Sequence, residues 1–101
     1  MSSQKRLLIG AGSDSGGGAG IQADIKTATA FGVYAMTAVT AVTVQNTRSV
    51  KAIHSIPPAI VAEQIAATLS DIGADAIKIG MLGSAAVVKA VAAALRKHAK
   101  K

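Results

Sequence analysis

The 101-residue chain contains no cysteine and no tryptophan, and Phe31 and Tyr34 are its only phenyl-type side chains. Without cysteine, the chain can form no disulfide, no thiolate metal site and no cysteine nucleophile. No apolar run reaches the roughly 18 residues of a membrane helix, and the opening MSSQKR lacks the apolar stretch of a signal peptide. We therefore expect one cytoplasmic domain over residues 1–101, with no membrane partner.

Half of the residues are apolar, but most of these are Ala, Val and Ile, so the core buries little area per residue. Acidic residues are also few: five Asp and Glu stand against eleven Lys and Arg, for a net charge of +6. Four cations fall in the last six residues: Arg96, Lys97, Lys100 and Lys101. A nucleic-acid surface would place aromatic or amide side chains among its charges. The pattern instead favours a solvated helix end whose cations suit the helix dipole, and nucleic acid is not expected as a partner.

The apolar pattern alternates between strand and helix. It predicts strands at 6–10, 33–44, 50–56 and 76–81, and helices at 21–31, from Pro57-Pro58 to near Gly73, and from a Ser84 cap to about 97. Gly32 is expected to end the first helix. This β-α-β-β-α-β-α order predicts an α/β domain in which helices pack on a mostly parallel sheet.

The segment AGSDSGGGAG, residues 11–20, joins the first strand to the first helix and is the candidate ligand site. Its glycine-rich part contains Asp14, Gly16, Gly17, Gly18 and Gly20. Consecutive glycines let backbone amides approach a ligand, and a helix amino terminus adds partial positive charge. Ligands of open α/β sheets bind at the carboxyl ends of strands, where this loop is predicted to lie.

The loop has three possible interpretations: a Walker P-loop, a dinucleotide site, or a connection without a ligand. A Walker P-loop is excluded because the loop has no lysine. Residues 18–23 fit GxGxxA, but residues 36–46 contain no Asp or Glu to hold a ribose, which disfavours a dinucleotide site. A flexible connection without a ligand leaves Ser13, Asp14 and Ser15 unexplained.

Three segments, AGSDSGGGAGIQADIKT, TAVTAVTVQNTRSV and IKIGML, resemble the bacterial hydroxymethylpyrimidine/phosphomethylpyrimidine kinases of thiamine biosynthesis in order and spacing. The resemblance covers essentially the whole chain; pyridoxal kinases share the fold but look less similar in these segments. It implies a three-layer ribokinase-like, Rossmann-like fragment. It also implies ATP-dependent phosphorylation of hydroxymethylpyrimidine and its phosphate, a small-molecule pyrimidine partner, and ATP and Mg as the cofactors of the family.

The resemblance assigns four substrate-binding residues. Gln45 matches the glutamine that pairs with the pyrimidine ring and its exocyclic amine, and a side-chain amide does offer both a donor and an acceptor. Gly12 and Ala19 match substrate-lining positions, and Met81 matches an apolar wall under the ring.

Other polar residues receive weaker assignments. Asp14 and Asp24 match acidic positions of the family motif, and Asp24 suits a capping or loop-bracing role equally well. Thr43 stands where relatives often have an apolar residue. His54 is expected at the surface, and Lys78 as an edge or snorkelling lysine rather than a phosphate ligand.

The family also uses a second glycine-rich motif, which forms the anion hole and supplies the catalytic base, and this chain contains none. We therefore expect the amino-terminal part of a kinase, with no catalytic residue, no metal site, no cofactor bound by this chain alone and no substantial activity alone. The alternative is an engineered or reconstructed non-enzymatic α/β folding module, which the Ala-rich helices and lysine-rich end suggest. A truncated sheet exposes an edge strand, so a homodimer or edge-strand association is also expected.

Overall fold

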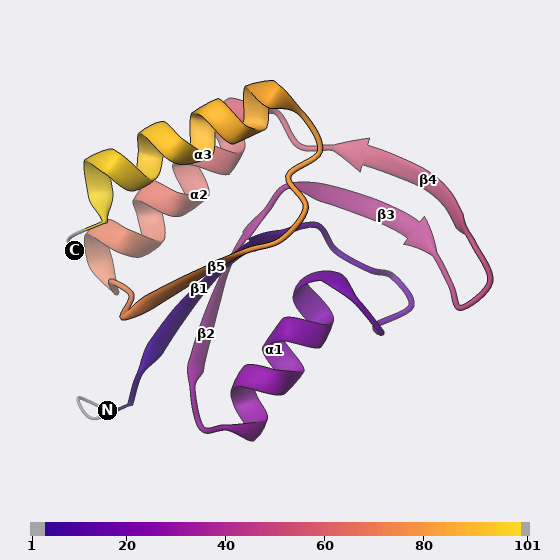
Figure 1. The fold of residues 1–101 in the computed structure, drawn as a ribbon, viewed down its shortest axis with the longest axis horizontal. Coiled ribbons are helices and arrows are strands. Elements are labelled where there is room, and N and C mark those ends of the chain that lie inside the picture. The colour runs from indigo at the N-terminus through magenta and orange to yellow at the C-terminus, as the bar shows by residue number, and fades with distance from the viewer. Residues whose placement is uncertain (1–3, 100–101) are drawn as a thin grey trace.

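The computed structural model describes residues 4–99, which form five strands and three helices. In chain order these are β1 (Arg6–Ala11), α1 (Gly20–Ala30), β2 (Tyr34–Val39), β3 (Ala41–Gln45), β4 (Val50–Ser55), α2 (Pro58–Asp71), β5 (Ala76–Ile79) and α3 (Ala85–His98). Figure 1 shows α2 and α3 side by side above the strands, and α1 below them. Within the described residues, no helix is long and apolar enough to span a membrane.

β1, β2 and β5 form a parallel sheet in the order β2-β1-β5. Leu8 of the central strand is in register with Met36 of β2 and Ile77 of β5. The helices that connect parallel strands cover the sheet, as the alternation of elements predicts. The α/β class and the mostly parallel sheet are thus confirmed.

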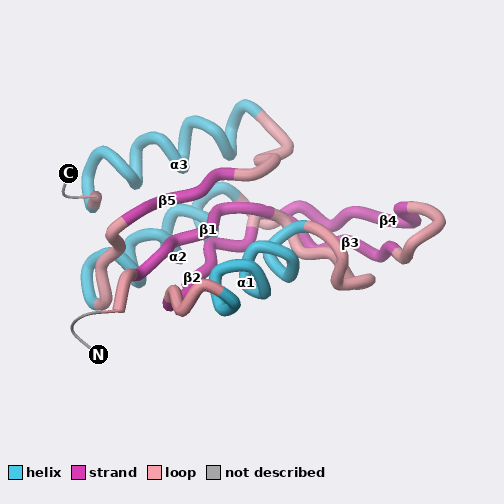
Figure 2. Tube along the Cα trace, turned by 60° about the horizontal axis from the view of Figure 1, so that its bottom comes forward, coloured by secondary structure: helices cyan, strands magenta, loops and turns pink. Residues whose placement is uncertain are grey.

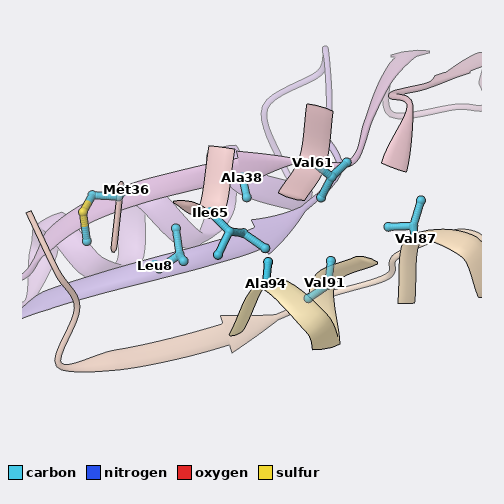
Figure 3. Close-up of a cluster of buried hydrophobic side chains, with 8 residues drawn as sticks. All are labelled: Leu8, Met36, Ala38, Val61, Ile65, Val87, Val91 and Ala94. Carbon is cyan, nitrogen blue, oxygen red and sulfur yellow. The ribbon is translucent and has the colours of Figure 1, made fainter. Parts of the chain in front are cut away.

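The two faces of the sheet carry different layers. Leu8 and Met36 face α2 and α3, where they join a buried cluster completed by Ala38, Val61, Ile65, Val87, Val91 and Ala94 (Figure 3). Ile9 is fully buried and points to the opposite face, since successive strand side chains alternate, and there α1 packs with its buried Ala28. Figure 2 shows the same arrangement from a second direction. The expected three layers are therefore present.

The long strand predicted over 33–44 is wrong, because the chain forms two strands there that belong to different sheets. β2 ends at Val39, whose backbone N–H and C=O are both bound by the Gln64 side-chain amide, at 2.8 and 2.9 Å. Thr40, only 2 % exposed, then donates its N–H to Ala11 O at 3.0 Å. The chain turns at this residue, and β3 pairs antiparallel with β4 instead.

The β3–β4 hairpin extends beyond the three-stranded sheet (Figure 1). The prediction of a half-exposed strand over 50–56 is wrong in burial, since every residue of β4 is exposed, including Val50 and Ile53. β4 pairs only with β3 in the described residues, and its own alternation does not produce alternating burial, whereas β3 alternates between half-buried and exposed residues.

The predicted helix ends agree with the structure more closely. Gly32 has φ +75° and donates its N–H to Thr29 O at 3.0 Å, which confirms it as the end of α1. The Ser84 hydroxyl accepts from the N–H of Val87 at 3.2 Å and caps α3. Arg96 and Lys97 lie in the last turn of α3, as expected, while Lys100 and Lys101 lie outside the described residues.

Sheet edges bear on the expected self-association. Within residues 4–99, β2 and β5 flank β1 and each has one edge without a strand partner. Unpaired edges of this kind can pair with a second copy, and the homodimer stays a prediction.

Arg6 and Asp75 fasten the start of β1 to the start of β5. Asp75 accepts from the Arg6 backbone N–H at 2.8 Å and from its guanidinium at 3.1 and 3.2 Å. The Arg6 guanidinium and then the Arg6 backbone N–H, despite partial burial, lower the pKa of Asp75 to about 2. The carboxylate is thus held in its charged form.

We expect acid to weaken the fold partly through Asp75. Because its pKa is lower in the folded than in the unfolded state, its contribution is complete above about pH 4 and is lost as the pH falls towards about 2. Urea unfolding from about pH 5 down to about pH 2 should therefore show a smaller decline in stability for Asp75→Asn than for the unmodified chain. Parallel curves for the two proteins would contradict this assignment.

Candidate functional site

A cavity of about 420 Å³ opens at the carboxyl end of the parallel sheet. It lies where the glycine-rich loop, the β3–β4 hairpin and the segment after β5 converge. Most lining residues are small or apolar, and the polar side chains among them are Ser13, Thr40, Thr43, Gln45, Ser55 and Lys78. An apolar cavity with few polar groups, at this edge of an α/β sheet, is typical of a small-molecule site.

All four residues predicted to bind substrate line this cavity: Gly12, Ala19, Gln45 and Met81. They come from the end of β1, the start of α1, the end of β3 and the segment after β5. Met81 is 86 % exposed and lines the cavity with its side chain open to solvent. Gly12 and Met81 are 69 positions apart in the sequence (81 − 12), and the fold brings both to one cavity.

Asp14 organises the glycine-rich loop from within. Its buried carboxylate accepts from the backbone N–H groups of Gly16, Gly18 and Ala19 at 2.7, 2.9 and 2.8 Å. Burial by itself raises the pKa of Asp14, but hydrogen bonds from the Gly16 N–H, the Gln45 side chain and the N–H groups of Ala19 and Gly18 outweigh it, and the net pKa is lowered. The carboxylate is therefore held charged as a loop brace.

This bracing changes the expected chemistry of the loop. The sequence suggested that the loop amides face a ligand, yet three of them donate to Asp14 instead. A fourth, the Gly17 N–H, donates to Asp14 O at 3.0 Å in a tight turn. The loop therefore contributes shape and a close backbone surface to the cavity more than free amide donors.

Hydrogen bonds with the backbone and one side chain of β3 hold the loop in place. Ser13 N–H donates to Ala41 O at 2.9 Å, and the Thr43 hydroxyl donates to Ser13 O at 2.7 Å. The Ser15 hydroxyl donates to Gln45 O at 2.5 Å and accepts from the Gln45 N–H at 2.7 Å. Ser15 and Thr43, to which the sequence assigned no such contact, thus fix where Gln45 lies.

Lys78 and Asp24 form an ion pair beside the cavity. The Lys78 ammonium donates to Asp24 Oδ2 at 2.8 Å. The sequence suggested that Asp24 caps α1 or braces the loop, and it does neither. Lys78 lies on β5, an edge strand of the sheet in the described residues, and lines the cavity. His54 is exposed, in agreement with its expected surface position.

The described residues do not fit the ATP and Mg that the resemblance implies. Among residues 4–99, no three or more His, Asp or Glu side chains are grouped to hold a metal ion. The glycine-rich loop has no lysine for nucleotide phosphates, and its amides bind Asp14.

A second cavity, of about 480 Å³, lies at the other end of the strands. Arg6, Asp75 and His98 are its ionisable lining groups, and the first two bind each other. It contains none of the predicted site residues, so size alone does not mark the site.

The sequence profile of the family described as phosphomethylpyrimidine kinase matches residues 14–101. The hydroxymethylpyrimidine/phosphomethylpyrimidine kinase of Mycobacterium leprae is 60 % identical over 87 residues, which are 86 % of this chain and 31 % of the relative. The thiamine biosynthesis bifunctional protein ThiED of Geobacter sulfurreducens is 54 % identical over 92 residues, which are 91 % of this chain and 19 % of the relative.

Solved structures show the same similarity. The phosphomethylpyrimidine kinase of Clostridium difficile 630 superposes with a TM-score of 0.88 at 44 % identity, covering 95 % of this chain and 41 % of that one. A Bacillus subtilis pyridoxal kinase in an ADP complex gives a TM-score of 0.86 at 35 % identity, covering 95 % and 38 %. The ribokinase-like arrangement is thus shared, and this chain spans well under half the length of these relatives.

Proposed function

Because this chain belongs to the phosphomethylpyrimidine kinase family, we propose that it forms the pyrimidine-binding part of such a kinase. The observation that carries this proposal is the convergence of Gly12, Ala19, Gln45 and Met81 on one cavity. The relatives are named for hydroxymethylpyrimidine and phosphomethylpyrimidine, so a substituted aminopyrimidine is the proposed ligand.

Gln45 supplies the recognition chemistry in this proposal. Its side-chain amide lies near Asp14 and helps to lower the pKa of that carboxylate. An amide has one oxygen that accepts and two N–H groups that donate. In this proposal the amide oxygen accepts from the exocyclic amine of the pyrimidine, and an N–H donates to a ring nitrogen.

Met81 and Gly12 would hold the ring by its faces. Met81 is 86 % exposed, and covering its thioether with a flat aromatic ring removes apolar surface from water. Gly12 offers a backbone without a side chain at the floor of the cavity. Both contacts favour a planar ligand over a flexible one.

We further propose that the chain alone does not transfer phosphate. Phosphoryl transfer depends on groups that position and neutralise the transferring phosphate, and the described residues include no group of three or more His, Asp or Glu side chains that could hold a metal ion. In the family, ATP and Mg would be held by the part of the relatives that has no counterpart here. A coupled ATP-turnover assay with the pyrimidine alcohol should give no rate above background, and measurable turnover would overturn this proposal.

Replacing Gln45 by alanine is expected to weaken hydroxymethylpyrimidine binding about tenfold, because one paired amide contact is lost. Calorimetric titration of the unmodified chain and of Gln45→Ala measures this. Gln4→Ala is the matched control, since the Gln4 amide donates to Gly32 O and does not line the cavity. If neither the unmodified chain nor the variant binds, the non-enzymatic folding module becomes the better account.

A further inference from the structure

We propose that Lys78 distinguishes phosphorylated from unphosphorylated pyrimidines in this cavity by binding the ester phosphate. The proposal rests on the proposed function, because it assumes that the cavity takes a pyrimidine. It goes further in assigning the preference between the two substrate forms to one side chain.

Within the described residues, the cavity has one charged side chain, and its charge is positive. Among the described lining residues Lys78 is the only charged side chain, and no carboxylate is among them. A phosphomonoester brings roughly −2 at neutral pH, whereas the corresponding alcohol is neutral. A ligand phosphate is therefore attracted by one ammonium and repelled by no lining carboxylate. A neutral alcohol has no charge for the ammonium to attract.

The start of α3 adds to this positive field. Gly83, just before the Ser84 cap of α3, lines the cavity. Helix amino termini carry partial positive charge and favour anions. At the start of α1 the Asp14 carboxylate already accepts from the Gly18 and Ala19 N–H groups, so that end is not counted, and Asp14 itself does not line the cavity.

Asp24 gives Lys78 an alternative partner. The two side chains are 48 % and 24 % exposed, and an ion pair in contact with water exchanges partners readily. Asp24 does not line the cavity. The Lys78 ammonium therefore breaks its ion pair with Asp24 when it binds a phosphate in the cavity. Asp24 thus competes with the phosphate for Lys78 and limits affinity for the phosphorylated form.

Gln45 and Lys78 line the same cavity from two different elements. Lys78 lies on β5, in register with Ile9 of β1, and Gln45 lies at the end of β3. In this proposal the Gln45 amide holds the ring and the phosphomethyl arm is directed towards β5.

Paired titrations of hydroxymethylpyrimidine and its monophosphate test this proposal. Lys78→Met should weaken binding of the monophosphate about tenfold and leave binding of the alcohol unchanged. Asp24→Asn should strengthen monophosphate binding, and Lys78→Arg should retain it. Lys89→Met is the control for simple loss of a cation, since Lys89 is exposed on α3 and does not line the cavity.

The outcomes separate this proposal from the one it rests on. If the chain binds the alcohol, and Lys78→Met leaves the affinity for the monophosphate unchanged, the role of Lys78 is overturned and the pyrimidine site is kept. Equal losses in Lys78→Met and Lys89→Met assign the effect to net charge and also overturn it. Failure of the unmodified chain to bind either ligand overturns both proposals. Thermal melts show whether Lys78→Met folds, and Lys78→Arg supplies the test if it does not.

Discussion

Replacing Gly20 by alanine is expected to destabilise the protein by about 3 kcal/mol, from the sum of backbone strain and a steric clash. Gly20 has φ +58°, which disfavours any residue with a Cβ atom. A Cβ atom there would lie 2.4 Å from the carbonyl oxygen of Gly12 and 3.3 Å from the N atom of Asp14. Both neighbours are backbone atoms, so relief requires the loop itself to move.

Gly32→Ala is the matched control for this prediction. Gly32 also has a left-handed φ, of +75°, but a Cβ atom there meets nothing within 4 Å. It should lose only the strain of the left-handed conformation, about 1 kcal/mol. Urea unfolding of both variants measures the difference, and equal losses would show that the contact with Gly12 is easily relieved.

Gly20→Ala should also weaken pyrimidine binding by more than its loss of stability alone would explain. The Gly12 carbonyl accepts from the Ile21 N–H at 2.9 Å, which joins the end of β1 to the start of α1 beside the cavity. Displacing that carbonyl moves Gly12 and Ala19, both of which line the cavity. Gly32→Ala, at the other end of α1, should bind hydroxymethylpyrimidine as the unmodified chain does.

Local signals in the sequence were sufficient where an element ends through its own residues. Gly32 ends α1 and Ser84 begins α3, because a glycine after a helix and a serine before one act within a few residues. The break between β2 and β3 has no such signal. It depends on the Gln64 amide, 25 residues away, which occupies the backbone of Val39. A uniform run of Ala, Val and Thr could not reveal it.

The same distinction explains the site. Family resemblance named Gly12, Ala19, Gln45 and Met81, and the fold places them around one cavity. The role of Asp14 follows from a local rule, since aspartate side chains commonly accept backbone N–H groups shortly after them. The contact of Lys78 with Asp24 spans 54 residues and requires β5 to lie near α1. No periodicity in the sequence predicts that pairing.

Ile65→Ala is expected to cost about 2–5 kcal/mol, because it removes most of a large buried side chain and leaves a cavity. Ile65 is 1 % exposed and belongs to the cluster between the sheet and the two helices α2 and α3 (Figure 3). Leu8 and Val61 are buried there to the same degree, and Val87 and Val91 are nearly as buried. The β-branched neighbours are stiff at χ1 and have little freedom to fill the space.

Ile60→Ala separates burial from residue type on the same helix. Ile60 is 45 % exposed, so its truncation should cost under about 1 kcal/mol. Urea unfolding monitored by circular dichroism gives both values. A small domain has a total stability of roughly 5–15 kcal/mol, so loss of Ile65 alone should leave a measurable unfolded population if this chain lies at the low end. Similar effects of the two substitutions would mean that the contacts between α2, α3 and the sheet do not form the core of the isolated chain.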